Sequence, residues 1–271
     1  MKNPTIIITG AAGGIGKAIA GRFARHSCNL VLNDLDEQSL QSVGQALADK
    51  PSVSVSICAG DLADPDFPGQ LVSHAMDKFG TIDTVVNNAA WRTLQSLRSI
   101  DHKTWQRTLD VCLTAPAFLI KYAANAMEEQ GTGGVVINVS SMMSDRAAGN
   151  SPAYIAVKAG LEGLTREAAV TYGRSGIRVL CVRPGFIETG LSMDYEKDAE
   201  VGGMARKLEG YITDATPLGR AGTPEEVADA VAWLCSAEAS FITGACLTID
   251  GGFSVNMNSY PLKKLQFPDE Y

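Results

Sequence analysis

Short apolar runs rich in isoleucine and valine recur along the chain, and longer segments with helical spacing separate them. The runs are continuous rather than alternating, so they predict strands that are covered on both faces, as in a parallel sheet. The predicted strands span residues 5–9, 30–33, 53–58, 84–87, 135–139, 178–182 and 246–249. The predicted helices span residues 14–25, 37–48, 68–78, 101–129, 153–172 and 225–235.

Strands that alternate with helices of this length predict a doubly wound α/β fold, with a parallel sheet and helices on both faces. Pro116 lies inside the segment 101–129, so we expect a kink or break near residues 111–115. Asp36 and Thr223 are predicted helix N-caps. Because no linker or repeat divides the chain, we expect a single domain over residues 1–252.

Two segments interrupt the regular pattern. Residues 190–216 carry many charges and several glycines, and we interpret them as a lid over a site, or as a pair of solvated surface helices. Residues 253–271 form a C-terminal extension. Its apolar side chains suit packing on a neighbouring subunit or closing a site, while a loosely ordered tail is an equal alternative.

Composition narrows the class of protein. With 45% hydrophobic residues in 271, the chain can bury a core, which excludes a disordered scaffold. It has no long apolar run and no signal-peptide pattern, so we expect a cytoplasmic protein without membrane partners. The 6 cysteines and 3 histidines are scattered, so no metal site is expected. The net charge of -7 disfavours nucleic acid as a partner.

A glycine-rich turn follows the first predicted strand and leads into a helix; residues 9–16 read TGAAGGIG. Glycines there allow a tight turn and let backbone N–H groups approach a pyrophosphate at the helix N-terminus. Asp34 ends the second strand, where a carboxylate accepts hydrogen bonds from the adenosine ribose and repels a 2′-phosphate. The pattern predicts NAD rather than NADP; the alternative is that Asp34 is a simple turn or capping residue.

Tyr154 and Lys158 are four residues apart on a predicted helix, so their side chains share one face. A lysine charge stabilises a nearby phenolate, and Tyr154 is then the general base in oxidation and the general acid in reduction. Ser141 follows the fifth strand, where its hydroxyl can hold a substrate oxygen. Ser140 is the alternative for this role.

In this order and spacing, the motifs resemble those of the classical short-chain dehydrogenases/reductases. The matching pieces are Thr9-Gly10 to Gly16, Asp61-Leu62, Asn87-Asn88-Ala89-Ala90, Ser140-Ser141, Tyr154-Ile155-Ala156-Val157-Lys158, Pro184-Gly185 and Thr243-Gly244 to Asp250-Gly251-Gly252.

The resemblance implies a Rossmann-type sheet and a catalytic set of Ser141, Tyr154 and Lys158. It implies cofactor contacts by Gly10, Gly14, Ile15, Gly16, Asp34, Asp61, Leu62, Asn88, Ala89, Tyr154, Lys158, Ile187 and Thr189. It also implies a homo-oligomer, a tetramer or dimer, that uses the helices 101–129 and 153–172 and the C-terminal strand region.

One position departs from the family pattern, because Cys112 stands where the family usually has asparagine. That asparagine holds a water in a proton relay to the lysine and helps maintain a local helix irregularity. A thiol is a poor hydrogen-bond partner by comparison. Two hypotheses follow: a working enzyme with a rearranged water chain, or a weak enzyme.

The substrate end is less well defined by sequence. By family position the pocket is lined by Trp91, Arg92, Met142, Met143, residues 148–151 and the lid. Methionine and tryptophan suggest an apolar wall. Arg92 could meet a carboxylate or phosphate, or make an ordinary surface pair. The acidic lid weakly disfavours a strongly anionic substrate.

The expected function is hydride transfer between NAD and a secondary alcohol or ketone, such as a sugar, polyol, cyclic alcohol or steroid. One alternative is a 3-oxoacyl-type reductase that uses NADPH. The other is a dinucleotide-binding regulatory protein in which Cys112 has impaired catalysis.

Overall fold

The computed structural model describes residues 3–50, 52–189 and 210–271. Its centre is a seven-stranded sheet with the order β3-β2-β1-β4-β5-β6-β7, and every neighbouring pair is parallel. The strands are β1 (Thr5–Thr9), β2 (Cys28–Asn33), β3 (Val53–Ile57), β4 (Thr84–Asn87), β5 (Gly134–Val139), β6 (Ile177–Pro184) and β7 (Cys246–Ile249). The strand order reverses between β1 and β4, the place where open α/β sheets bind ligands.

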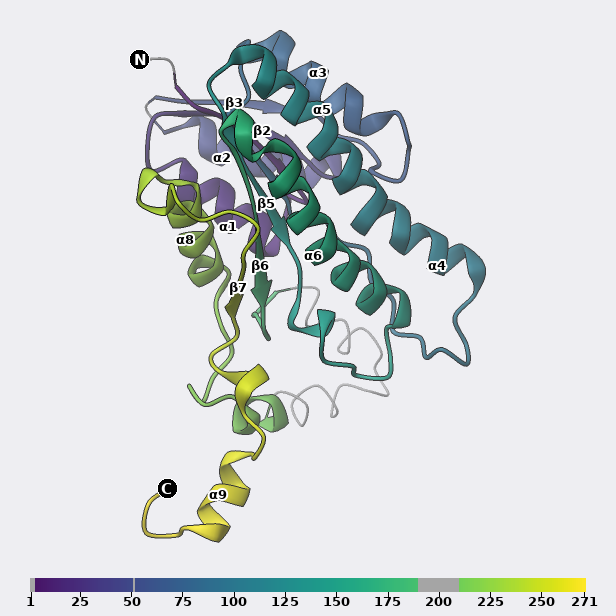
Figure 1. The fold of residues 1–271 in the computed structure, drawn as a ribbon, viewed down its shortest axis with the longest axis vertical. Coiled ribbons are helices and arrows are strands. Elements are labelled where there is room, and N and C mark those ends of the chain that lie inside the picture. The colour runs from purple at the N-terminus through teal and green to yellow at the C-terminus, as the bar shows by residue number, and fades with distance from the viewer. Residues whose placement is uncertain (1–2, 51, 190–209) are drawn as a thin grey trace.

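Helices cover both faces of this sheet (Figure 1). On one face lie α1 (Gly14–Phe23), α2 (Glu37–Ala48) and α8 (Pro224–Cys235). On the other lie α3 (Phe67–Phe79), α4 (His102–Leu109), α5 (Ala115–Gln130) and α6 (Pro152–Tyr172). The doubly wound fold predicted from the apolar runs is confirmed.

The alternation of side chains along the strands divides the core into two layers. Ile6 and Ile8 of β1 point into the layer under α1, α2 and α8, while Ile7 points into the layer under α3, α5 and α6. All three are essentially inaccessible to solvent. Burial on both faces is why the strands have continuous rather than alternating apolar runs.

The segment predicted as one helix over 101–129 is two helices joined by a π-helix, Asp110–Thr114. The N–H of Ala115 bonds to the carbonyl of Asp110, five residues earlier. Pro116 has no N–H to give to the carbonyl of Cys112, which would be its α-helical partner. The break therefore lies where Pro116 predicted it, but its form is a π-helix rather than a simple kink.

Beyond the sheet, the structure describes part of each irregular segment. Residues 190–209 of the expected lid lie outside the described residues, and residues 210–215 are helical. The C-terminal extension contains a helix that was not predicted, α9 (Tyr260–Gln266), which projects from the body of the molecule and buries none of its residues (Figure 1). Among the described helices, none combines the length and the apolar character needed to cross a membrane.

Candidate active site

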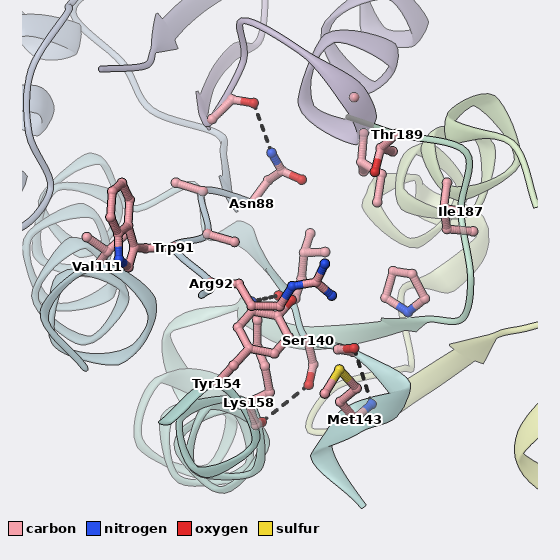
Figure 2. A pocket seen from close by; sticks show the side chains of 18 of the residues that line it. Asn88, Trp91, Arg92, Val111, Ser140, Met143, Tyr154, Lys158, Ile187 and Thr189 are labelled. Carbon is pink, nitrogen blue, oxygen red and sulfur yellow. Dashed lines mark hydrogen bonds between the residues drawn. The ribbon is translucent and has the colours of Figure 1, made fainter. Parts of the chain in front are cut away.

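A cavity of about 960 Å³ opens at the carboxyl ends of the strands. Apart from Gly16, every residue that the sequence placed in the cofactor or catalytic set lines this cavity: Gly10, Gly14, Ile15, Asp34, Asp61, Leu62, Asn88, Ala89, Ser141, Tyr154, Lys158, Ile187 and Thr189. Figure 2 shows several of them around one hollow, with Asn88, Ile187 and Thr189 on one side and Tyr154 and Lys158 on another. The structure therefore brings together residues that are up to 179 positions apart, from Gly10 to Thr189.

The glycine turn at one end of the cavity needs its glycines. Gly10 and Gly14 have positive φ angles of 65° and 50°, which L-residues with a side chain rarely adopt. A Cβ on Gly16 would overlap the carbonyl oxygen of Gly10, so Gly16 acts beneath the turn rather than on the cavity wall. Asn88 fixes the turn from the next strand, because its Nδ2 donates to the carbonyls of Thr9 and Gly10 at 3.0 Å each.

These features fit the pyrophosphate of a dinucleotide. A Cβ on Gly10 would lie 2.8 Å from the Cα of Ala89, so only glycine lets the turn pack this closely against the loop after β4. The N-cap of α1 is Gly13, which has no side chain to bond to the first N–H groups of the helix. Gly13, Gly14 and Ile15 all line the cavity. The N-terminus of α1 therefore faces the cavity, where its free N–H groups and the helix dipole can stabilise an anion.

Asp34 lies at the end of β2, beside the glycine turn. Its carboxylate accepts hydrogen bonds from the backbone N–H groups of Ala12 at 2.9 Å, Leu35 at 2.8 Å and Asp36 at 3.2 Å. A carboxylate has about four acceptor positions, so these bonds orient the group as part of the turn and leave room for a ribose hydroxyl.

Asp61, at the end of β3, pairs with Arg107 of α4. The guanidinium donates to the carboxylate at 2.6 Å. Partial burial opposes ionisation, but the hydrogen bond and the charge of Arg107 outweigh it and lower the pKa of Asp61. The Arg107 guanidinium also lies 5.2 Å from the ring centre of Trp91. Sequence reasoning missed Arg107, because no local pattern relates α4 to the end of β3.

The three predicted catalytic residues lie on the opposite wall. Tyr154 and Lys158 extend from α6, with the Lys158 Nζ 5.3 Å from the centre of the Tyr154 ring (Figure 2). Lys158 is only 2% exposed, and its Nζ donates to the carbonyl of Val139 at 2.6 Å. Ser141 follows β5, and its Oγ accepts the N–H of Met143 at 3.2 Å. One helix and one strand end thus place a phenol, an ammonium group and a hydroxyl at one wall.

Ser140, the alternative serine, has a hydroxyl that is engaged elsewhere. Its Oγ donates to Glu162 at 2.9 Å, and the residue is buried. Both carboxylate oxygens of Glu162 accept from Arg183, at 3.0 and 2.6 Å. Burial opposes the ionisation of Glu162, but the bonds from Arg183 lower its pKa. Ser140 therefore belongs to a buried ionic network behind Lys158.

Glu162 also belongs to the group of three metal-ligating side chains found within the described part of the chain. Its partners there are Cys181 and Cys246 on the adjacent strands β6 and β7. Since Arg183 already occupies both carboxylate oxygens, a cation would have to displace a bound guanidinium. The sequence expectation of no metal stays a prediction.

Cys112 lies in the π-helix and is 1% exposed. Its sulfur accepts the N–H of Trp91 at 3.2 Å, and its thiol donates to the Trp91 carbonyl at 3.6 Å. Burial raises the pKa of the thiol, although the charge of Lys158 partly offsets this, so the group stays neutral near pH 7. Cys112 therefore connects the helix irregularity to the loop after β4.

The substrate end of the cavity is formed by loops. Of the residues expected there, Trp91, Arg92, Met142, Met143, Ala148 and Asn150 line it. Gly149 and Ser151 do not; the Ser151 hydroxyl donates to the carbonyl of Thr93 at 3.2 Å. Tyr211 and Ile212, which belong to the expected lid, also line the cavity, whereas Arg146, Phe186 and Phe253 were not predicted to do so.

Phe253 shows that the C-terminal extension begins at the cavity. It follows Gly251 and Gly252, whose φ angles of 62° and 88° turn the chain. The Gly-Gly pair is the sequence feature that could have predicted a turn of the chain back toward the cavity.

Comparison with known proteins agrees with this geometry. Residues 10–254 match the family model described as enoyl-(acyl carrier protein) reductase. The chain is 37% identical over 249 residues to cis-4-hydroxycyclohexanecarboxylate dehydrogenase of Sinomonas cyclohexanicum, covering 92% of this chain and 95% of that protein. It is 36% identical to 3beta-hydroxysteroid dehydrogenase 2 of Eggerthella lenta, covering 92% and 94%.

A solved structure is similar in fold. L-sorbose reductase from Gluconobacter frateurii, crystallised with NADPH and L-sorbose, superposes with a TM-score of 0.88 at 28% identity, covering 95% of this chain and 98% of that one. Together with the parallel sheet and the order of the motifs along it, these matches show that the chain belongs to the short-chain dehydrogenase/reductase family and is an oxidoreductase of CH–OH groups.

Proposed function

We propose that this enzyme is an NAD-dependent dehydrogenase that moves a hydride between the nicotinamide and a secondary alcohol or ketone. The observation that carries the proposal is the placing of Ser141, Tyr154 and Lys158 on one wall of a cavity whose other end is the glycine turn. The bound nicotinamide supplies the hydride chemistry, and the protein supplies position and proton transfer.

The proposed roles follow from the chemistry of each group. The Ser141 hydroxyl holds the substrate oxygen and stabilises the charge that develops on it. Tyr154 takes the hydroxyl proton when an alcohol is oxidised and returns one when a ketone is reduced. Lys158 stabilises the phenolate, and the ammonium group, which has three donors, bonds to Val139 with one of them and to ribose hydroxyls of the cofactor with others.

The proposed cofactor contacts extend from the glycine turn toward the adenosine. The N–H groups at Gly14 and Ile15 bind the pyrophosphate, and Asp34 binds the ribose hydroxyls. Asp61 and Leu62 lie around the adenine, Asn88 and Ala89 along the ribose, and Ile187 and Thr189 at the carboxamide.

NAD is the proposed cofactor because of the charges near Asp34. The cations that line the described cavity are Arg92, Arg107, Arg146 and Lys158. Of these, Arg107 pairs with Asp61, and the other three follow or lie beside β4 and β5 rather than β2. A 2′-phosphate would therefore meet the carboxylate of Asp34 at the end of β2.

The proposed substrates are ring-bearing secondary alcohols and the corresponding ketones. Apolar side chains that line the substrate end, among them Trp91, Met142 and Phe186, suit the faces of an aliphatic ring. Relatives named for a cyclic hydroxy acid and for a hydroxysteroid fit the same class.

The test is a panel of alcohols with NAD or NADP, followed by the absorbance of the reduced nucleotide. The panel contains cis-4-hydroxycyclohexanecarboxylate, its carboxamide, a 3β-hydroxysteroid, an aldose and a polyol. We expect NAD reduction with at least one ring alcohol and its loss in Tyr154→Phe. Tight NAD binding without turnover on any member would favour a regulatory protein, and turnover only with NADP would favour a biosynthetic reductase.

We also propose a homo-oligomer, either a tetramer or a dimer. Large apolar side chains are exposed on the helices and strand that the family uses for contacts: Phe118 of α5, Val170 of α6 and Leu247 of β7. The molar mass in solution from light scattering tests this; a mass near the 28.6 kDa of one chain would contradict it.

A further inference from the structure

We infer that the substrate carries a carboxylate in addition to its hydroxyl or keto group, and that Arg92 binds this carboxylate. The inference rests on the proposed function, because it places the reacting oxygen at Tyr154. It assigns a specificity-determining role to a residue of the loop after β4.

Arg92 lies beside the reacting groups. The Cζ of its guanidinium is 5.9 Å from the centre of the Tyr154 ring, and Figure 2 shows the two side chains together at the cavity. Arg92 lines the cavity, and its Nε is shielded from solvent. A cation in such a partly desolvated place interacts with an anion more strongly than one on the open surface.

Charge is distributed unequally along the described part of the cavity wall. The carboxylates that line it, Asp34 and Asp61, both lie at the adenosine end, after β2 and β3. At the substrate end the charged side chains are Arg92, Arg146 and Lys158, all cationic. Arg146 donates to the carbonyl of Ser254, and Lys158 is buried below Tyr154. The guanidinium of Arg92, on the loop after β4, lies 5.9 Å from the centre of the Tyr154 ring, where a substrate that reacts at Tyr154 would meet it.

The walls around Arg92 favour a carboxylate on a small apolar body over a larger anion. Trp91, Met142 and Phe186 line the same end, and they offer dispersion contacts rather than hydrogen bonds. A guanidinium matches a carboxylate with two parallel N–H bonds. Since it has five N–H donors in all, Arg92 can bind the carboxylate and keep its other contacts.

The loop that carries Arg92 is held from two sides. The N–H and carbonyl of the preceding Trp91 bond to the thiol of Cys112, at 3.2 and 3.6 Å. The Trp91 ring lies under the guanidinium of Arg107 at 5.2 Å. A guanidinium on such a fixed loop is positioned before the substrate arrives, which favours selectivity.

The experiment uses two substrates that differ only in charge, cis-4-hydroxycyclohexanecarboxylate and its carboxamide. For the wild type with saturating NAD, we expect kcat/KM to be about 10- to 100-fold higher for the carboxylate, the range for a charge-assisted hydrogen bond. Arg92→Gln should lose most of this preference, so that the ratio of kcat/KM for the carboxylate to kcat/KM for the carboxamide approaches one, and Arg92→Lys should keep part of it. Arg98→Gln is the matched control, because Arg98 is exposed in the same loop and outside the cavity.

A second measurement separates this inference from the proposed function. Calorimetric binding of cyclohexanecarboxylate and cyclohexanecarboxamide to the NAD-saturated enzyme requires no turnover. If the wild type binds the acid more tightly than the amide and Arg92→Gln does not, the inference is supported, even if neither alcohol reacts. The lack of reaction would then count against the proposed dehydrogenase activity and not against the role of Arg92. The role of Arg92 would be overturned if the wild type showed equal kcat/KM and equal affinity for the carboxylate and the carboxamide. It would also be overturned if Arg92→Gln lowered kcat/KM for both compounds by the same factor.

Discussion

The two ends of the cavity are built in different ways. At the end with the glycine turn the wall is formed by backbone groups and short turns, such as Gly10, Gly14 and the hydrogen bond from the N–H of Ala12 to Asp34. At the substrate end the wall is made by side chains from distant elements, among them Arg92 and Phe253. The glycine turn of the first end is specified by local sequence, whereas the second end exists only once the fold has assembled. Variants should therefore affect cofactor binding and chemistry separately.

Tyr154→Phe should have the largest effect, and this effect should fall on the chemistry far more than on NAD binding. The substitution removes the phenolic hydroxyl and keeps the ring, so kcat should fall by about 10²- to 10⁴-fold, the range for a general acid–base group. NAD affinity, measured by protein fluorescence, should change by less than about threefold, since the glycine turn and Asp34 are untouched.

Tyr172→Phe is the control for Tyr154→Phe. Tyr172 ends the same helix and lies outside the described cavity lining. Its kcat should match that of the wild type. A Tyr154→Phe enzyme with near-normal turnover on an identified substrate would show that another group transfers the proton.

Gly16→Ala should damage the dinucleotide end. The added Cβ overlaps the carbonyl oxygen of Gly10, and either the turn or α1 must shift. The overpacking should cost about 1–3 kcal/mol of stability, which lowers the melting temperature by several degrees. The displaced turn should also weaken NAD binding, by about 100-fold if most of this cost falls on the binding site. Thermal denaturation and NAD titration measure the two effects.

Gly21→Ala provides the comparison within the same helix. A Cβ on Gly21 meets nothing within 4 Å, so alanine there should stabilise α1 by about 1 kcal/mol or less and leave NAD binding unchanged. Equal behaviour of Gly16→Ala and Gly21→Ala would show that the close approach at Gly16 is not needed.

Asp34→Asn should reduce the preference for NAD over NADP by about tenfold, because it removes the charge that opposes a 2′-phosphate and keeps an acceptor oxygen. The ratio of kcat/KM for the two nucleotides measures this. Asp36→Asn makes the same change two residues away, at the N-cap of α2, where asparagine caps equally well. If both variants shift the ratio alike, the effect comes from net charge and not from the place of Asp34.

Cys112→Ala should have the smallest effect, because Cys112 lies behind Trp91 and outside the described cavity lining. Loss of both bonds to Trp91 should cost about 1 kcal/mol of stability and loosen the loop, which raises the KM for the alcohol by a few-fold with little change in kcat. Cys28→Ala, a buried thiol in β2 away from the cavity, should lower stability without changing KM. A large loss of kcat in Cys112→Ala would instead place the thiol in proton transfer.

The strands of the sheet and the residues that line the cavity could be predicted because each depends on a local pattern, whereas the order of the strands was not predicted. Continuous apolar runs marked the strands, and the glycine turn and Tyr154 with Lys158 follow fixed spacings. Pro116 marked the place of the helix break for the same reason. The resemblance implied a local helix irregularity at Cys112, but no local pattern indicates that its form is a π-helix.

The contacts that escaped prediction all join elements that are far apart in sequence. Arg107 reaches Asp61 across 46 residues, and Arg183 reaches Glu162 from β6 to α6. No periodicity or turn propensity encodes which arginine meets which carboxylate. Such pairs become visible only when the packing of the helices on the sheet is known.

The π-helix between α4 and α5 also limits which insertions and deletions the chain tolerates. A π-turn holds one residue more than an α-turn, so removing a single residue from 110–114 would take this extra residue out of the turn, while Pro116 would still leave one helical hydrogen bond unmade. Each residue of an α-helix turns the chain by about 100°. α4 would therefore rotate by about that angle against α5, and Arg107 would leave both Asp61 and Trp91. A one-codon deletion here would therefore separate residues at the cavity wall although it removes none of them.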